Sequence, residues 1–140
     1  MTVERTFPAR LEALADLVAF TASSFKQEDV DPHLLTTVDF VLEELFTNVV
    51  KYGSRASTAP VAVRVALRPV PGGVEVVLTA DGVDDFDVTQ APQVDTSLPI
   101  EQRRPGGLGL HLIRRLVDSI EYQYQVSQMR SRVTFRKTTA

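Results

Sequence analysis

The chain has 140 residues, a net charge of −3 and no cysteine. This length is typical of one domain with a single hydrophobic core. With 44% apolar and 24% charged residues, the composition is that of an ordinary globular protein. The absence of cysteine excludes disulfides, thiolate metal sites and a cysteine nucleophile. The negative charge offers no basic field, so we expect no direct binding to nucleic acid.

The N-terminus carries charged residues from the start and lacks the unbroken apolar run of a signal peptide. No stretch approaches the roughly 20 apolar residues of a membrane-spanning helix. We therefore expect a cytoplasmic protein that does not bind membranes. No internal repeat or change of composition divides the chain, so a single domain over residues 1–140 is expected.

The first half of the chain predicts a strand and two helices. The strand covers residues 3–7, and a helix follows from apolar residues at roughly helical spacing, namely Leu11, Leu14, Val18 and Phe25. Asp31 and Pro32 are typical of an N-cap and a first helical residue, and Gly53 is typical of a helix C-terminus. The long second helix between them has one apolar face, which we expect to be buried: Leu34, Val38, Val41, Leu42, Leu45 and Val49.

The second half predicts a hairpin, a lid, a helix and two strands. Alternating apolar residues at 61–67 and 74–80 flank a turn at 69–73. Residues 81–105 lack periodicity, and so long a connection is uncommon in a compact domain unless it is a functional lid or disordered. A helical face then precedes two alternating strands: Leu112, Ile113, Leu116 and Val117, then Ile120, Tyr122, Tyr124, Val126, Val133 and Phe135. The order β-α-α-β-β-lid-α-β-β predicts an α+β fold, with helices on one face of a mostly antiparallel sheet.

Candidate chemistry first occurs on the long helix. Glu44, Asn48 and Lys51 project within about 60° of one another, on the flank of the apolar face. A carboxylate and a carboxamide on adjacent turns suit Mg²⁺ and a water or hydroxyl, because Mg²⁺ prefers hard oxygen ligands. The alternative is that these residues are solvated helix positions.

Two further segments offer sites for parts of a nucleotide. Asp81 and Gly82 end the hairpin, where a carboxylate could accept a hydrogen bond from an exocyclic amine; a simple turn is the alternative. The glycine-rich run 106–109 directly precedes a helix, which is typical of a phosphate site, although a flexible connector is also possible. Arg103 and Arg104 precede it, where a guanidinium could reach a phosphoryl group. His33 and His111 are isolated and predict no zinc site.

The order of these segments resembles the GHKL ATPases. VLEELFTNVVKYG is similar to their N-box, ADGVDDFDV to the first glycine box and RRPGGLGLHLIRRLVD to the second. The match covers nearly the whole chain and is closest to the anti-sigma-factor serine/threonine kinases of the sporulation and general-stress type. It implies a Bergerat-type α/β sandwich with a mostly antiparallel, mixed sheet, and an ATP lid at about residues 84–105.

The resemblance also implies site residues, cofactors and partners. Glu44 would activate the attacking hydroxyl, Asn48 would coordinate Mg²⁺, Asp81 would bind the adenine amine and Arg104 would contact the terminal phosphate. The implied nucleotide-binding residues are Asn48, Lys51, Asp81, Gly82, Gly106, Gly107, Leu108 and Gly109. The implied reaction transfers the γ-phosphoryl group of ATP to a serine or threonine of a STAS-type anti-anti-sigma protein. The implied second partner is a sigma factor, and relatives commonly form homodimers.

Two positions depart from the family pattern. Val83 occupies a glycine position of the first glycine box, where a β-branched residue is expected to narrow the adenine pocket or restrict the backbone. Residues 128–131 replace a Gly or Asn turn, which we expect to affect local turn geometry more than chemistry. Two alternatives to the kinase stay open: a non-catalytic, nucleotide-gated partner-binding module, and an ATPase-like domain from a larger signalling protein.

Overall fold

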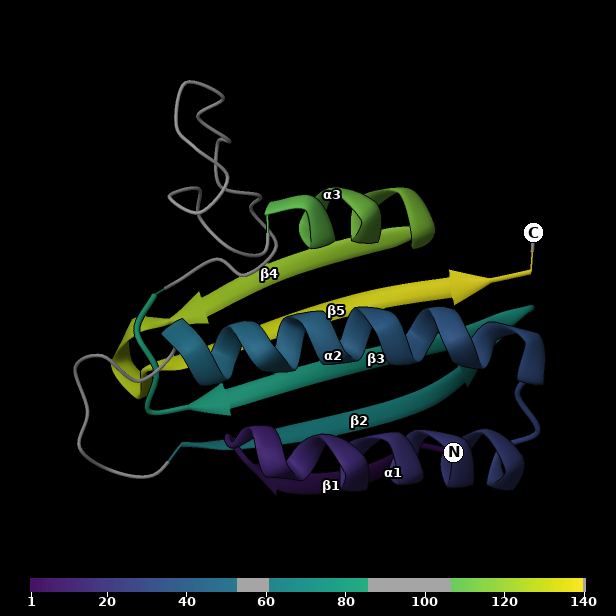
Figure 1. Ribbon diagram of the computed structural model, residues 1–140, viewed down its shortest axis with the longest axis horizontal. Coiled ribbons are helices and arrows are strands. Elements are labelled where there is room, and N and C mark those ends of the chain that lie inside the picture. The colour runs from purple at the N-terminus through teal and green to yellow at the C-terminus, as the bar shows by residue number, and fades with distance from the viewer. Residues whose placement is uncertain (53–60, 86–106, 140) are drawn as a thin grey trace.

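The structure, a computed structural model, describes residues 1–52, 61–85 and 107–139 (Figure 1). Its helices and strands are β1 (Val3–Pro8), α1 (Leu14–Gln27), α2 (Leu35–Tyr52), β2 (Ala62–Val70), β3 (Gly73–Asp81), α3 (Gly107–Leu116), β4 (Ser119–Gln125) and β5 (Arg130–Thr138). Short 3-10 turns precede α1 and α2 and join β4 to β5: η1 (Leu11–Ala13), η2 (Pro32–Leu34) and η4 (Val126–Gln128). The predicted order of elements is confirmed.

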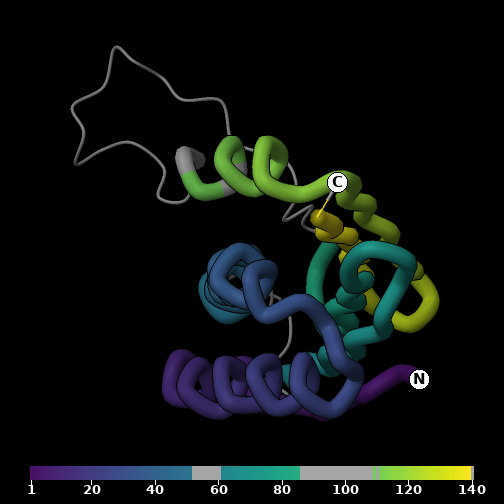
Figure 2. The backbone as a smooth tube through the Cα atoms, turned by 90° about the vertical axis from the view of Figure 1, so that its right-hand side faces the viewer, coloured from purple at the N-terminus to yellow at the C-terminus, as the bar shows by residue number. Residues whose placement is uncertain are grey.

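The strands form one sheet in the order β1-β2-β3-β5-β4. Each pairing between neighbouring strands in this order is antiparallel, so the described sheet is antiparallel rather than mixed. The side view shows the helices in one layer against one face of this sheet (Figure 2). The predicted α+β sandwich is therefore confirmed.

The core lies between α2 and the inner face of the sheet. The predicted face of the second helix is buried throughout, and Phe46 is fully buried beside it. The hairpin contributes alternate residues, because successive side chains of a strand point to opposite faces. Those of the inner face pair across the register, for example Val65 with Leu78 and Val63 with Ala80. The hairpin turn is tighter than predicted, since β2 continues to Val70 and β3 begins at Gly73.

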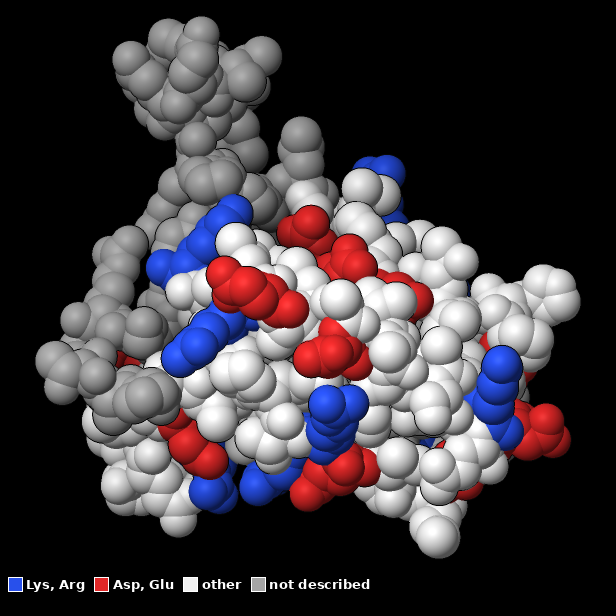
Figure 3. All heavy atoms as spheres, turned by 60° about the horizontal axis from the view of Figure 1, so that its bottom comes forward, with Lys and Arg blue, Asp and Glu red and all other residues white. Residues whose placement is uncertain are grey.

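The apolar residues that predict the first helix do not all face the core. Leu11 and Val18 are 51% and 36% exposed, whereas Phe25 is buried together with four residues that the spacing did not single out, namely Leu17, Phe20, Thr21 and Ser24. Thr21 and Ser24 donate their hydroxyl protons to carbonyls one turn back, at 2.9 and 2.7 Å. Polar groups satisfied within their own helix can be buried at little cost, which turns the other face toward solvent. Figure 3 shows the side that carries α1, where acidic and basic side chains are interspersed among uncharged ones.

Two later apolar residues are also exposed, against the predicted pattern. Leu112 on α3 is 49% exposed, whereas Ile113 and Val117 are buried. Val126, predicted to continue β4, is 78% exposed because the strand ends at Gln125 and the chain enters η4. β4 therefore ends one residue earlier than the sequence predicts.

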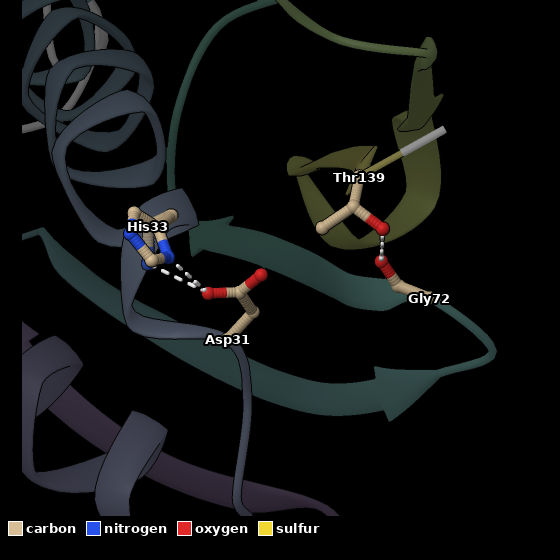
Figure 4. Close-up of polar contacts among 4 residues, drawn as sticks. All are labelled: Asp31, His33, Gly72 and Thr139. Carbon is tan, nitrogen blue, oxygen red and sulfur yellow. Dashed lines mark hydrogen bonds and ion pairs between the residues drawn. The ribbon is translucent and has the colours of Figure 1, made fainter.

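The connection between α1 and α2 is fixed by its backbone. Asp29 adopts a left-handed conformation with φ of 55°, and Val30 donates its N–H to the Phe25 carbonyl at 2.9 Å. Asp31 caps the next turn by accepting the N–H of His33 at 2.9 Å (Figure 4). The predicted N-cap is thus confirmed, although it caps η2 directly before α2; Gly53 lies outside the described residues.

Residues near the C-terminus close the hairpin at the same end of the molecule. Thr139 donates its backbone N–H and its hydroxyl to the Gly72 carbonyl, at 2.9 and 3.3 Å (Figure 4). Gly72 has a φ of +78°, which a glycine adopts without steric cost. The end of β5 is thereby attached to the turn between β2 and β3.

One carboxylate is buried between the first two helices without full compensation. Asp39 on α2 has a buried Oδ1 atom for which the described residues provide no hydrogen-bond partner. Burial, together with the carboxylate of Glu43, raises the pKa of Asp39 from 3.8 to about 6. Thr21 lowers the pKa of Asp39 and so offsets part of this rise, while the Thr21 hydroxyl donates its proton to the Leu17 carbonyl.

We predict that Asp39 makes the stability of the fold depend on pH. The folded state binds this proton more tightly than the unfolded chain, so the free energy of unfolding decreases as pH rises from about 4 to about 6. The free energy of unfolding of Asp39→Asn should exceed that of the wild type by about 1 kcal/mol at pH 7, after allowance for solvent screening. At pH 4 the two free energies should be equal. Urea unfolding at both pH values measures this, and Glu43→Gln should give a smaller gain. Identical pH profiles for Asp39→Asn and the wild type would contradict the prediction.

Candidate nucleotide site

The second and third helices meet at a glycine. A Cβ atom added at Gly109 would lie 2.5 Å from Oε2 and 2.8 Å from Cδ of Glu44. Such distances are too short for a side chain, so only glycine lets the first turn of α3 approach the carboxylate of Glu44 this closely. The structure therefore brings together the acid of the predicted N-box and a glycine of the predicted second glycine box, 65 residues later in the chain.

The other polar residues of α2 differ in exposure. Asn48, one turn after Glu44, is only 6% exposed, whereas Glu44 is partly buried and Lys51 is exposed. A carboxylate and a carboxamide thus lie on consecutive turns at the border of the core, with Lys51 further out. A buried carboxamide provides a fixed oxygen ligand, which suits a cation bound at this helix.

The glycine-rich run lies partly inside a helix. The sequence predicts a loop over 106–109, but α3 begins at Gly107, so Gly107, Leu108 and Gly109 form its first turn. The N–H groups of a first turn have no partner within the helix and carry the positive end of its dipole. The predicted anion site is therefore a helix terminus, while Gly106 lies outside the described residues.

The carboxylate predicted to bind adenine has a partner in the protein. Asp81 ends β3 and pairs in register with Arg130, whose Nε lies 2.5 Å from Oδ1 of Asp81. Because side chains alternate along a strand, Asp81 shares a face with Glu75, opposite to buried Ala80. In this structure the carboxylate is thus bound to Arg130 and is not grouped with Glu44 and Asn48.

The first glycine box needs glycine at one position, and that position is Gly82. Among the described residues, positive φ angles occur at Asp29, Gly72, Gly82 and Met129, and Gly82 has a φ of +76°. Val83 has an ordinary backbone conformation and is 2% exposed, with its side chain in the core. The expected restriction of the backbone by Val83 therefore does not arise.

The turn before the last strand contacts the first glycine box, which the sequence did not indicate. Met129 supplies the left-handed residue of this turn, with φ and ψ both 47°. Its carbonyl accepts the N–H of Val83 at 3.0 Å. Tyr124 donates its hydroxyl to the Val83 carbonyl at 2.6 Å, and Tyr122 donates to Oδ1 of Asp85 at 3.0 Å. The departure from the family pattern at 128–131 thus lies beside the candidate site.

Several predicted features lie outside the described residues. Arg103 and Arg104 belong to this group, as does nearly all of the predicted lid, of which only Asp84 and Asp85 are described. Within the described ranges, no three histidine or acidic side chains form a metal cluster. His33 bonds to Asp31 through Nδ1 at 2.9 Å, consistent with the structural role expected for it.

Comparison with known families identifies the chain. Residues 7–137 match the family described as the histidine kinase-like ATPase domain. The chain belongs to this family, which is part of the GHKL superfamily. No curated protein matches the sequence. No helix among the described residues is both long and apolar enough to cross a membrane.

The family accounts for the central geometry. Histidine kinase-like ATPase domains bind ATP, typically with Mg²⁺. The residues present fit this ligand, because Glu44 and Asn48 provide hard oxygen atoms and Gly109 lets the first turn of α3 lie close to the Glu44 carboxylate. ATP binding is thus the activity that the family and the structure support together.

We predict that Gly109→Ala weakens ATP binding without weakening the fold. The new methyl group must displace the Glu44 carboxylate, so ATP affinity, measured by isothermal titration calorimetry, should fall about tenfold. The thermal midpoint should be unchanged or higher, because alanine favours a helix over glycine by up to about 1 kcal/mol.

A second substitution checks the cause. Glu44→Asp in the Gly109→Ala background shortens the acid and should restore part of the affinity. Equal ATP affinities for wild type and Gly109→Ala would show that the close approach of α3 to Glu44 is not needed for the nucleotide.

Proposed function

We propose that the protein is an ATP-dependent serine/threonine kinase of the anti-sigma-factor type. It transfers the γ-phosphoryl group of ATP to a serine or threonine of a STAS-domain anti-anti-sigma protein, and it also sequesters a sigma factor. The observation that carries the proposal is the contact between Glu44 and Gly109. This contact supports the proposal because it brings a carboxylate next to the first turn of α3, whose N–H groups suit phosphates.

In this proposal Glu44 acts as the general base. It accepts the proton of the substrate hydroxyl while the oxygen of that hydroxyl bonds to the γ-phosphorus. The bond from that phosphorus to the bridging oxygen breaks, and ADP leaves with the bonding electrons. Catalysis of this kind depends mainly on positioning and on stabilising charge.

The remaining residues bind and orient. Asn48 would hold Mg²⁺, which supplies charge neutralisation for the phosphate oxygens. The first turn of α3 would donate its N–H groups to the phosphates, and Arg104 is proposed to contact the terminal phosphate. Asp81 is proposed to bind the adenine amine, for which its ion pair with Arg130 must open.

The same surface would then switch between partners. A phosphorylated STAS protein carries nearly two additional negative charges at the contact, so it dissociates from an interface that fitted the neutral hydroxyl. Release of the STAS protein frees the kinase to bind a sigma factor, and binding of an unmodified STAS protein reverses this.

A second candidate is a nucleotide-gated module that binds a partner without phosphorylating it. The ion pair between Asp81 and Arg130 occupies the carboxylate proposed for the adenine amine, so it must open for nucleotide binding in either candidate. The core position of Val83 is compatible with either candidate.

The kinase proposal predicts the outcome of one substitution. With γ-labelled ATP, Mg²⁺ and candidate STAS proteins from the same genome, the wild type should label a STAS serine or threonine. Glu44→Gln keeps the size of the side chain but cannot accept the proton, so the labelling rate should fall at least about a hundredfold. ATP affinity should stay within about threefold, since the amide still fits beside Gly109.

Glu43→Gln is the matched control, because Glu43 is the exposed neighbour of Glu44 on the same helix. It should label the STAS protein at the wild-type rate. Tight ATP binding without labelling of any candidate would replace the kinase with the binding module. If the protein binds no ATP at all, both the kinase and the nucleotide-gated binding module are ruled out.

We also propose that the protein forms a homodimer through β1 and α1. β1 is a terminal strand of the described sheet, and α1 packs beside it, with Leu11 of η1 and Val18 of α1 exposed. A terminal strand presents unpaired backbone groups that can pair with a second copy. This face therefore combines hydrogen-bonding and apolar surface.

The dimer proposal predicts the effect of one charge. Val18→Glu should convert the dimer to a monomer in light scattering coupled to gel filtration. Ser23→Glu, at an exposed position of the same helix outside the apolar residues, should leave the dimer intact. A wild-type monomer at all concentrations would contradict the proposal.

A further inference from the structure

α3 is the outermost helix of the layer that covers the sheet. It follows α1 and α2 across this layer, and no described element lies beyond it on the side away from α2 (Figure 2). Ile113 attaches α3 to the core, whereas His111, Leu112 and Arg115 are exposed. Leu112 alone is 49% exposed. The fold therefore leaves one side of α3 available to another molecule.

An apolar strip on α3 begins beside the contact between Gly109 and Glu44. At 100° per residue, Leu116 and Leu112 lie within about 60° of Gly109 around the helix, and Leu112 is about 4.5 Å further along its axis. Leu116 is half-buried and Leu112 is exposed. The strip thus extends from the candidate site to the exposed side of the helix.

A positive charge borders this strip. Arg115 lies about 60° beyond Leu112 around the helix, and His111 lies one turn before Arg115 on the same side. Within the described ranges Arg115 forms no ion pair, and Asp118, the next acidic residue, accepts the Thr138 hydroxyl at 2.6 Å. α3 contains no acidic residue, although the chain has a net charge of −3. The exposed side of α3 therefore suits an acidic partner.

The charge of Arg115 also has a simpler explanation. A basic residue in the last turn of a helix interacts favourably with the helix dipole. Lys26 has the same place on α1 and is exposed as well. The dipole accounts for a charge at this place, but not for the exposed Leu112 beside it. Lys26 is therefore the matched control for a role of Arg115 in binding.

We propose that the exposed side of α3, formed by His111, Leu112 and Arg115, is the docking surface for the protein substrate. It binds an acidic segment of the STAS protein, in which an apolar side chain covers Leu112 and a carboxylate pairs with Arg115. The occupant is the STAS protein because its hydroxyl must come to Glu44, next to this surface, whereas a sigma factor receives no phosphoryl group. The inference rests on the proposed kinase function.

The dimensions allow one substrate to reach both places. Arg115 is six residues after Gly109, which is about 9 Å along the helix axis. Three residues of extended chain span about 10 Å. An acidic residue a few positions from the accepting serine or threonine therefore reaches Arg115 while the hydroxyl lies at Glu44.

Steady-state labelling kinetics test the docking surface. Arg115→Glu places a carboxylate opposite the acidic segment, so it should raise the KM for the STAS protein at least about tenfold and leave kcat within about twofold. Leu112→Ser should raise this KM about fivefold. ATP affinity, measured by calorimetry, should stay at the wild-type value in both variants. Lys26→Glu reverses the same kind of helix-end charge and should leave the KM unchanged.

A charge swap identifies the contact. Acidic residues of the STAS protein around its labelled residue are replaced singly by lysine, and one replacement should raise the KM with the wild-type kinase and lower it with Arg115→Glu. If none does so, the pairing with Arg115 is overturned. Arg115→Gln takes the place of Arg115→Glu if the latter does not fold, with an expected rise in KM of about threefold.

The outcomes separate this inference from the proposed function. A wild type that labels no STAS protein contradicts the proposed function, and the docking surface with it. Labelling that Glu44→Gln abolishes, with one KM shared by wild type, Arg115→Glu and Leu112→Ser, overturns the docking surface alone. A lower mass of Leu112→Ser in light scattering would show that a second copy covers this side of α3 instead of the substrate.

Discussion

The arrangement of the candidate site depends on one steric constraint, the absence of a side chain at Gly109. α2 is fixed by its buried apolar face, and α3 is held by buried Ile113, with Val117 buried directly after the helix. With a Cβ atom at Gly109, the carboxylate of Glu44, which ends a flexible side chain, would have to move away from the first turn of α3. The distance between the acid and the first turn of α3 is therefore set by this glycine.

A second group of contacts lies at the end of β3. The turn between β4 and β5 places a carbonyl, a hydroxyl and a guanidinium against the segment from Asp81 to Asp85. Met129 adopts the left-handed conformation that this turn needs, a conformation that costs a residue with a side chain about 1–2 kcal/mol. The contacts of its carbonyl and of its neighbours with the glycine box give this unusual turn a structural reason. The last hairpin and the first glycine box thus form one unit.

The apolar pattern of the sequence predicted buried residues best where one face of a helix is apolar and packs against the sheet. All six apolar residues predicted to be buried on η2 and α2 are buried, because this face meets the sheet, and Phe46 beside them is buried as well. For the first helix the apolar spacing predicted the element but only part of its buried face, since Thr21 and Ser24 satisfy their hydroxyls on carbonyls of their own helix and are buried beside Phe25. A hydropathy pattern counts them as polar. The residue type alone does not show whether a serine or threonine hydroxyl bonds to a carbonyl of its own helix, although both residues can form this bond within a helix.

The order of local motifs was sufficient for the fold and the family, because the N-box and the glycine boxes are short segments whose residues follow one another along the chain. The distances between motifs depend on how the elements pack, and these came from the structure. It placed Glu44 against Gly109, bound Asp81 to Arg130, and moved the left-handed position of the first glycine box to Gly82. It also gave the segment around Met129 a contact with the site. Such contacts join residues 46 to 65 positions apart, and a residue's partner at that separation is set by strand register and helix packing rather than by local sequence.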